Sequence, residues 1–192
     1  MKQARIAFAT TIPTDATPFI AATTSIKEKL GDVFDTCLRT GGEFRDFGSL
    51  GEFIEFARKS HVVIVHLMGD LPEFDLLVSS LKSAGVPLFA STSFFGPNLK
   101  YRDVSTVEQE DYKEIFRYLN YGGKKNFENL LLYLANRFTG ASYEVKAPER
   151  PPWEGIYHPE FENPPTIEEY TAKKIVPGRP TVGIWFHHTQ WG

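Results

Sequence analysis

Four short apolar runs recur along the first 140 residues, each separated from the next by a segment with a helical period. They are Arg5–Thr11, Phe34–Arg39, His61–Met68 and Val86–Ser91. Continuous apolar runs of this length are typical of strands that are covered on both faces, as in a parallel sheet. We therefore predict four buried strands.

Helix signals fall between these runs. The first helix should end before Gly31, because glycine readily adopts the left-handed conformation that stops a helix. An S-x-x-E capping box at Ser49 predicts the start of a second helix, and the same pattern recurs at Ser105. A further helix should begin near Asp70 and Pro72. It would turn three leucines inward: Leu76, Leu77 and Leu81.

The clearest helical stripe lies near residue 130. Its apolar positions follow the spacing of one helix face: Phe127, Leu130, Leu131, Leu134, Ala135 and Phe138. Strands that alternate with helices over short connections form βαβ units. Right-handed crossovers then predict an α/β fold, a three-layer, doubly wound parallel sheet of the flavodoxin-like or Rossmann-like kind.

The composition of the chain changes near residue 145. Eight of the 13 prolines and all three tryptophans follow that point. We predict that residues 1–144 form the α/β domain and that residues 145–180 form a proline-rich linker, with one short helix from Thr166. The apolar run in residues 181–192 would be the first strand of a following domain that the chain does not contain.

The charge and cysteine content limit the classes of partner. The net charge is −3, whereas nucleic-acid-binding domains usually carry a basic surplus, so we expect no nucleic-acid partner. No run approaches the roughly 18 apolar residues of a membrane helix, and the N-terminus does not resemble a signal peptide, so we expect no membrane partner. The single cysteine, Cys37, cannot form an internal disulfide and should be a core residue, which fits a cytoplasmic location.

Candidate ligand-binding residues lie at the carboxyl ends of the predicted strands, where doubly wound sheets bind their ligands. The loop after the first strand carries the hydroxyls of Thr10, Thr11 and Thr14, while His66 and Ser91 end the third and fourth strands. Hydroxyls and helix amides can hold a phosphate, but ordinary turn chemistry also favours threonines in such a loop. His66 can likewise be a buried histidine with one structural partner.

Sequence motifs for catalysis are missing. The chain has no G-x-G-x-x-G, no P-loop, no H-E-x-x-H and no G-x-S-x-G, and its acidic residues lack a metal-ligand spacing. We therefore predict no catalytic residue and no metal site. Three aromatic residues recur every four positions among the prolines: Trp153, Tyr157 and Phe161. They would either pack back onto the α/β domain or contact a partner.

Three parts of the chain resemble one known family. They are His61–Ala90, Asp103–Phe138 with its GGKKNFENLLLYL motif, and GIYHP at Gly155–Pro159 followed by RPTVGIWFHHTQW at Arg179–Trp191. Their order and spacing resemble the N-terminal region of the large subunit of cobaltochelatase, the CobN type. This subunit is related to the porphyrin-binding H subunit of magnesium chelatase.

The resemblance implies a much longer subunit that binds a tetrapyrrole and inserts a divalent metal, cobalt or magnesium. In that family ATP is hydrolysed by partner subunits and the reacting groups lie downstream, so no catalytic residue can be assigned here. We expect an N-terminal domain or fragment of a chelatase that inserts cobalt into a corrinoid precursor in cobalamin biosynthesis. Its partners would be the remainder of the large subunit and the ATPase subunits. The alternative is a stand-alone flavodoxin-like module that binds a small ligand or another protein.

Overall fold

The structure is a computed structural model that describes residues 3–69, 71, 73–93, 99–150, 154–161 and 164–185. Its centre is a four-stranded sheet of parallel strands in the order β2-β1-β3-β4. The strands are β1 (Ala4–Thr10), β2 (Phe34–Thr40), β3 (Val62–Leu67) and β4 (Leu88–Thr92). The predicted fold class, a doubly wound parallel sheet of the flavodoxin-like kind, is therefore confirmed.

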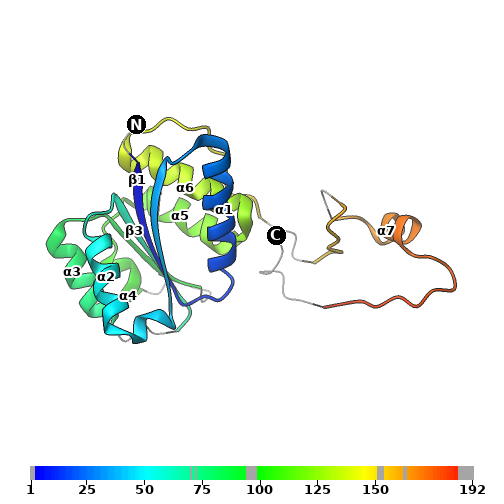
Figure 1. Cartoon of the computed structure of the whole chain (residues 1–192), viewed down its shortest axis with the longest axis horizontal. Coiled ribbons are helices and arrows are strands. Elements are labelled where there is room, and N and C mark those ends of the chain that lie inside the picture. The colour runs from blue at the N-terminus through cyan, green and yellow to red at the C-terminus, as the bar shows by residue number, and fades with distance from the viewer. Residues whose placement is uncertain are drawn as a thin grey trace.

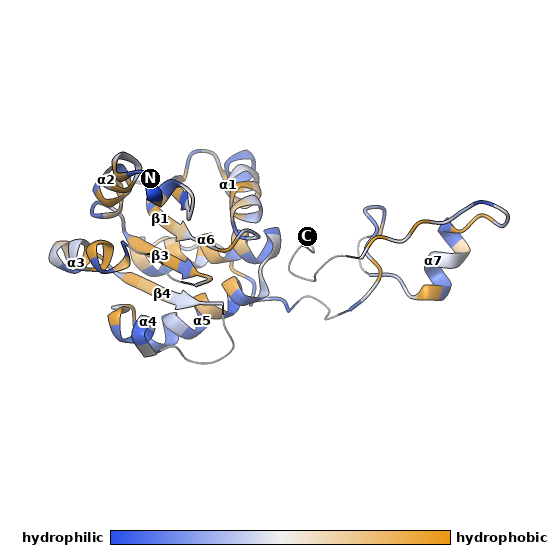
Figure 2. Cartoon of the chain, turned by 90° about the horizontal axis from the view of Figure 1, so that it is seen from below, coloured by the Kyte–Doolittle hydropathy of each residue, from blue (hydrophilic) through white to orange (hydrophobic). Residues whose placement is uncertain are grey.

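Helices cover both faces of the sheet and form the two outer layers (Figure 1). On one face lie α1 (Ala16–Leu30), α5 (Gln109–Tyr121) and α6 (Gly123–Thr139). On the other face lie α2 (Phe47–Ala57), α3 (Phe74–Ala84) and α4 (Leu99–Val104), preceded by a short 3-10 turn at Glu43–Arg45. Figure 2 shows the apolar residues gathered on the strands and on the helix faces that meet them.

Burial of the central strands on both faces explains their continuous apolar sequence. In β1, Ile6 and Phe8 pack toward α1 and α6, whereas Ala7 and Ala9 pack toward α2 and α3. Successive side chains of a strand point to opposite faces, so a strand between two helix layers needs apolar residues at every position. The Phe8 ring lies 5.0 Å from that of Phe19 in α1.

The helix ends confirm some sequence signals and correct others. Gly31 follows α1 with a φ of 79°, as predicted. The predicted capping box at Ser49 is wrong, because Asp46 caps α2 by accepting from the backbone amides of Gly48 and Ser49 at 3.3 and 3.1 Å. The Ser49 hydroxyl instead accepts from Nε of Arg39 at 3.0 Å. Aspartate and serine both favour the N-cap position, and here the earlier residue takes it.

The second predicted capping box, at Ser105, is also wrong. Its hydroxyl donates to the carbonyl of Tyr101 at 2.8 Å and accepts from the amide of Ala90 at 2.9 Å. Ser105 thus serves the backbone of β4 rather than the start of α5, which begins at Gln109. A serine hydroxyl offers one donor and two acceptor sites, and tertiary contacts decide where they are used.

Two further expectations concern α3. Leu77 and Leu81 are buried as predicted, but Leu76 is 53% exposed. The inward face of α3 carries residues at the i, i+3, i+4 and i+7 positions, starting from Phe74, and position 76 falls outside that stripe. The expected start signals Asp70 and Pro72 lie outside the described residues.

The helix α6 holds the segment that follows it as an extended strap, residues 143–149. Both amide atoms of Asn136 pair with the backbone of Tyr143, at 2.7 and 2.8 Å. Asn129 Oδ1 accepts from the Lys146 amide at 2.8 Å. The strap extends beyond residue 145, where the sequence predicts the start of a linker.

The strap is anchored at its far end by Asn126 and in its middle by Tyr118. Both amide atoms of Asn126 pair with the backbone of Glu149, at 2.8 and 2.9 Å. The hydroxyl of Tyr118 donates to the Lys146 carbonyl at 2.6 Å. Burial raises the pKa of Tyr118 to about 12, so this donor keeps its proton at neutral pH. Every one of these bonds is to the strap backbone, and the side chain of Val145 adds a contact with the core on the α6 side.

After residue 150, the described residues include the short helix α7 (Ile167–Lys174), which lies apart from the sheet in Figure 1. Thr166 and Glu169 form a complete capping box at its start, so the helix predicted from Thr166 is confirmed. The ring of Tyr170 lies 5.8 Å from His158 and 6.3 Å from Phe161, so Phe161 packs on α7 rather than on the α/β domain.

The remaining expectations for this region are not all within the described residues. Trp153 and residues 186–192 lie outside them. Residues 181–185 have no strand assignment, and Val182 and Ile184 are exposed. The first strand of a following domain therefore stays a prediction.

Removing the anchor should release the strap. In Asn126→Ala, two hydrogen bonds to Glu149 are lost. The net contribution of each hydrogen bond to the stability of the attached strap is about 1 kcal/mol. Because 1.4 kcal/mol is tenfold in an equilibrium constant, we expect tryptic cleavage after Lys146 to become about tenfold faster or more. Limited proteolysis followed by mass spectrometry measures this rate.

The matched control is Asn120→Ala, which removes an exposed asparagine from the neighbouring helix α5. Its cleavage rate after Lys146 should equal that of the unchanged chain. Equal cleavage rates for both variants would show that Asn126 does not hold the strap.

Candidate functional site

The most polar part of the sheet interior lies at the point where the strand order changes direction. From β1 the chain crosses first to β2 on one side and then to β3 on the other. The loops that leave β1 and β3 therefore diverge, and this divergence is where doubly wound sheets form their crevice. The register sets Thr10 of β1 beside His66 of β3, and His66 beside Ser91 of β4.

These three side chains share one face of the sheet and are all buried. Thr10 and Ser91 are 1% exposed, and His66 is 3% exposed. Each follows by two residues an apolar side chain that packs against α1, α5 or α6, and therefore points to the same face. The three predicted residues Thr10, His66 and Ser91 thus form one polar row at the carboxyl edge of the sheet.

Asp15 joins this row from the loop that leads into α1. Its side chain is buried, and its Oδ2 accepts from the Thr10 hydroxyl at 2.8 Å. The same oxygen lies 2.9 Å from Nδ1 of His66. Asp15 precedes the first residue of α1 but makes no side-chain cap. The positive end of the helix dipole still favours a carboxylate at this place.

The contact with Asp15 determines how the imidazole can act. A carboxylate only accepts hydrogen bonds, so Nδ1 of His66 carries the proton in the pair. The second ring nitrogen, Nε2, then has a lone pair for an outside donor when the ring is neutral. The buried carboxylate of Asp15 fixes the orientation of the His66 ring. In proteins generally, histidines that hold a ligand or move a proton are oriented by such an acceptor.

The other predicted residues divide into one with a structural role and one with no described contact. The Thr11 hydroxyl accepts from the Met68 amide at 2.7 Å and donates to the Met68 carbonyl at 3.1 Å, which ties the two diverging loops together. Thr14 is half-buried and makes no side-chain hydrogen bond among the described residues. Because the hydroxyls of Thr10 and Thr11 already have acceptors, and Asp15 is negative, this geometry argues against a phosphate.

The row contains one buried polar atom without a partner. The hydroxyl oxygen of Ser91 makes no hydrogen bond among the described residues. Buried hydroxyls in native proteins nearly always have a partner, and an unsatisfied one costs about 1–3 kcal/mol. Ser91 and the second nitrogen of His66 are therefore the groups of this row that are available to a ligand.

Nucleophilic catalysis by Cys37 and metal binding are two other chemistries that the residue types allow. Burial raises the pKa of the Cys37 thiol, which keeps it protonated at neutral pH and disfavours a nucleophilic role. Among the described residues, no group of three or more His, Cys, Asp or Glu side chains lies close enough to hold a metal ion. Within the same part of the chain, no helix is long and apolar enough to cross a membrane.

The sequence predicted three members of the row but missed Asp15. The three were found because parallel strands end at a common edge of the sheet. Asp15 lies in an irregular loop, and its inward orientation depends on the path of the chain between β1 and α1. Its position just before a helix was the one available signal, and that signal usually indicates a cap.

The C-terminal part of the chain matches a known protein family. Residues 116–192, from within α5 to the last residue, match the model of the CobN/Magnesium Chelatase family. The predicted resemblance to CobN-type chelatases is confirmed. It extends through α6 and the strap, which are the parts that connect the α/β domain to the tail.

Two individual proteins are similar to most of the chain. An uncharacterized protein of Methanocaldococcus jannaschii is 33% identical over 199 aligned residues, which cover 95% of this chain and 15% of that protein. The catalytic subunit of cobaltochelatase from Mycobacterium tuberculosis aligns with a TM-score of 0.62 and 17% identity, over 80% of this chain and 12% of that one. The second likeness shows the fold. The chain thus spans less than a fifth of the length of either protein.

Mutation of Asp15 and His66 should show that the two side chains are coupled in their effect on the free energy of unfolding. In Asp15→Ala, His66 and Thr10 lose their common acceptor, and we expect a loss of about 1–3 kcal/mol in the free energy of unfolding. His66→Ala should cost a similar amount. Urea denaturation of both variants and of the double variant gives the interaction energy.

Because the two side chains are in contact, the double variant should be more stable than the sum of the single effects predicts, by about 0.5 kcal/mol or more. The exposed carboxylate variant Glu55→Ala, combined with His66→Ala, provides the additive control. Additive effects for Asp15 and His66 would mean that the pair does not interact in solution.

Proposed function

We propose that this chain is the N-terminal domain of the tetrapyrrole-binding subunit of an ATP-dependent metal chelatase. The reaction would be insertion of cobalt into a corrinoid precursor during cobalamin biosynthesis, in the cytoplasm. The observation that supports this proposal is the family match over residues 116–192. The fold shared with a cobaltochelatase subunit agrees with it.

The motifs that the chain has and lacks indicate which parts of such an enzyme would hydrolyse ATP and which would bind the tetrapyrrole and the metal. It has no P-loop, so ATP would be hydrolysed by the partner subunits. The macrocycle and the entering metal would be held by parts of the long subunit that follow this domain. The α/β domain would act as a head, and the strap on α6 would fix where the chain leaves it.

Metal insertion can be followed by the absorption change of the tetrapyrrole. We expect the 192-residue chain alone to insert no cobalt, with or without ATP, because it lacks the downstream reacting groups. A subunit that continues beyond this chain, supplied with its ATPase partners, ATP and cobalt, should insert the metal. The same subunit without residues 1–149 should be slower.

Either of two results would contradict the proposal. One is metal insertion by the 192-residue chain alone. The other is a longer subunit that binds no tetrapyrrole and inserts no metal in the presence of its ATPase partners. The ATPase partners without the long subunit are the control, because any metal insertion they support has to be subtracted.

A second candidate function rests on the polar row of the sheet. We propose that Ser91 and His66 bind a small polar molecule at the crevice, with Thr10, Thr11 and Thr14 shaping its wall. The supporting observation is the unpartnered hydroxyl of Ser91 beside an imidazole whose other nitrogen is already held by Asp15. A ligand with a hydroxyl or an amide would both donate to Nε2 and bond to the serine.

Titration with flavin, inorganic phosphate and a tetrapyrrole, followed by intrinsic fluorescence, tests this site. We expect at least one organic ligand to bind with a Kd below about 1 mM, or about −4 kcal/mol, and Ser91→Ala to weaken it about fivefold or more. Ser79→Ala, in the exposed face of α3, should leave the Kd unchanged. Absence of binding below 1 mM for every compound would remove the support for this site.

A further inference from the structure

The two edge strands of the sheet, β4 and β2, differ in whether their outward backbone groups have hydrogen-bond partners. On the outer side of β4, the amide of Leu88 donates to the Thr106 hydroxyl at 2.9 Å, and its carbonyl accepts from the Thr106 amide at 2.8 Å. The amide of Ala90 donates to Ser105, and its carbonyl accepts from the Tyr112 hydroxyl at 3.2 Å. This edge is therefore closed by side chains and backbone from the residues that follow β4.

The outer side of β2 is open over its first half. The amide of Ala4 donates to Val33, and the register pairs Ala4 with Phe34, so the odd-numbered residues of β2 bond to β1 and the even-numbered residues face outward. The outward groups of Phe34 and Thr36 have no hydrogen-bond partner among the described residues. Unpaired strand edges of this kind are templates for another strand.

Toward the end of β2 the outward groups are partly occupied. The carbonyl of Leu38 accepts from the Arg39 guanidinium at 3.0 Å, and the amide of Thr40 donates to Glu43 at 2.7 Å. A carbonyl oxygen has two lone pairs, so Leu38 can accept a second bond. The stretch available to a further strand is therefore Phe34–Leu38.

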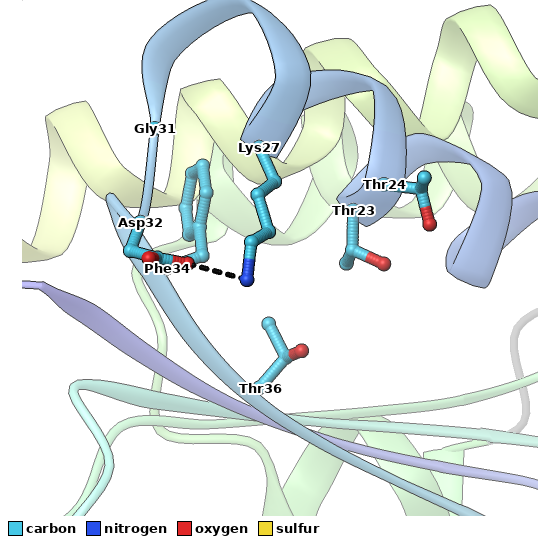
Figure 3. A pocket seen from close by; sticks show the side chains of 7 residues that line it. All are labelled: Thr23, Thr24, Lys27, Gly31, Asp32, Phe34 and Thr36. Atoms are coloured by element: carbon cyan, nitrogen blue, oxygen red, sulfur yellow. Dashed lines mark ion pairs between the residues drawn. The ribbon is translucent and has the colours of Figure 1, made fainter.

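A hollow of about 220 Å³ runs beside this open stretch, between α1 and β2 (Figure 3). Thr23, Thr24 and Lys27 of α1 line one side, and Thr36 lies across from them. An ion pair of 2.8 Å between Lys27 and Asp32 closes one end. The hollow has room for the side chains of a strand that pairs with β2.

The sequence of β2 is complementary in charge to itself. Asp35 and Arg39 lie two residues before and two residues after Cys37. If two copies of this strand run antiparallel about Cys37, Asp35 of each copy stands opposite Arg39 of the other. Opposite charges directly across an antiparallel pair are stabilising. These contacts would add to the ion pairs within each copy, Asp35 with Arg5 and Arg39 with Glu52, both at 3.4 Å.

The backbone geometry permits the same register. Pairing about Cys37 sets Thr36 of one copy opposite Leu38 of the other, and both belong to the outward-facing set. They can exchange both of their backbone hydrogen bonds, as directly opposed residues do in antiparallel pairs. The Leu38 side chain, which packs against the core of its own copy on the same face of the sheet as Thr36, then lies at the edge of the hollow of the second copy.

We propose that the open edge of β2 binds the β2 edge of a second copy of this chain. The two four-stranded sheets would join into one sheet of eight strands, with a two-fold axis at Cys37. The symmetry is that of most homodimers, because the same surface serves both copies. Charge complementarity and register select this partner over another extended segment.

Oxidative cross-linking tests the register directly. Cys37 is the single cysteine, and it would face its copy in a non-hydrogen-bonded pair, with Cα atoms about 4.5 Å apart. This separation lies within the range of about 4.4–6.8 Å that a disulfide spans. Copper–phenanthroline, which removes one hydrogen from each thiol, should give a disulfide-linked dimer on a non-reducing gel.

Charge variants test the interface in the 192-residue chain by sedimentation velocity. Asp35→Arg and Arg39→Asp each place like charges opposite each other, so each variant alone should associate at least tenfold more weakly. An equal mixture of the two variants should recover the dimer, because the arginine introduced at position 35 then faces the aspartate introduced at position 39. Glu55→Arg, the same charge change on the exposed face of α2, should associate normally.

Thr36→Pro provides an independent test, because it removes an outward amide at the centre of the interface. It should be monomeric while its circular dichroism spectrum is retained. A monomeric unchanged chain up to about 100 µM, without cross-linking through Cys37, would overturn the proposal, as would failure of the mixed charge variants to associate. If the edge were instead covered by another part of a longer subunit, the 192-residue chain would be monomeric in these tests.

Discussion

Burial of β1 between two helix layers is the constraint around which the rest of the domain is arranged. Its side chains alternate between Phe8 and Ile6 on the α1 side and Ala7 and Ala9 on the α2 side. The large residues on one face fill the space between the sheet and the helices α1 and α6. The small residues on the other face allow α2 to approach the sheet closely. Polar groups can enter this interior only where the strand ends, which is why Thr10 lies beside Asp15 and His66.

The sequence contains enough information for the strands, most of the helices and the fold class. Apolar runs and the stripe that starts at Phe127 depend on local periodicity, and burial follows periodicity closely when a sheet lies between two helix layers. The errors arise where a polar side chain had several partners to choose from. Asp46 displaced Ser49 as the cap of α2, and Ser105 turned to the edge of β4. Such choices depend on distances between segments that are far apart in the sequence.

The candidate site was predictable to the same extent. Strand ends in a parallel sheet meet at one edge, so His66 and Ser91 were expected near Thr10 without knowledge of the register. The role of Asp15 could not be foreseen, because an aspartate before a helix ordinarily caps it. The anchoring role of the asparagines in α6 could not be predicted from the sequence either, since an amide on a helix surface is usually solvated. Only the returning path of residues 143–149 gives Asn126 and Asn136 their function.

The strap has a mechanical consequence for any chain that continues from it. Tyr143 binds near the C-terminal end of α6 and Glu149 near its N-terminal end, so the strap runs back along the helix. A force applied to the tail along that direction is shared by all the strap bonds at once, as shear. A force directed away from the helix loads the Asn126 contact first and would peel the strap one bond at a time. Resistance to pulling would therefore depend on direction, and α6 would transmit tension to α1 and the sheet.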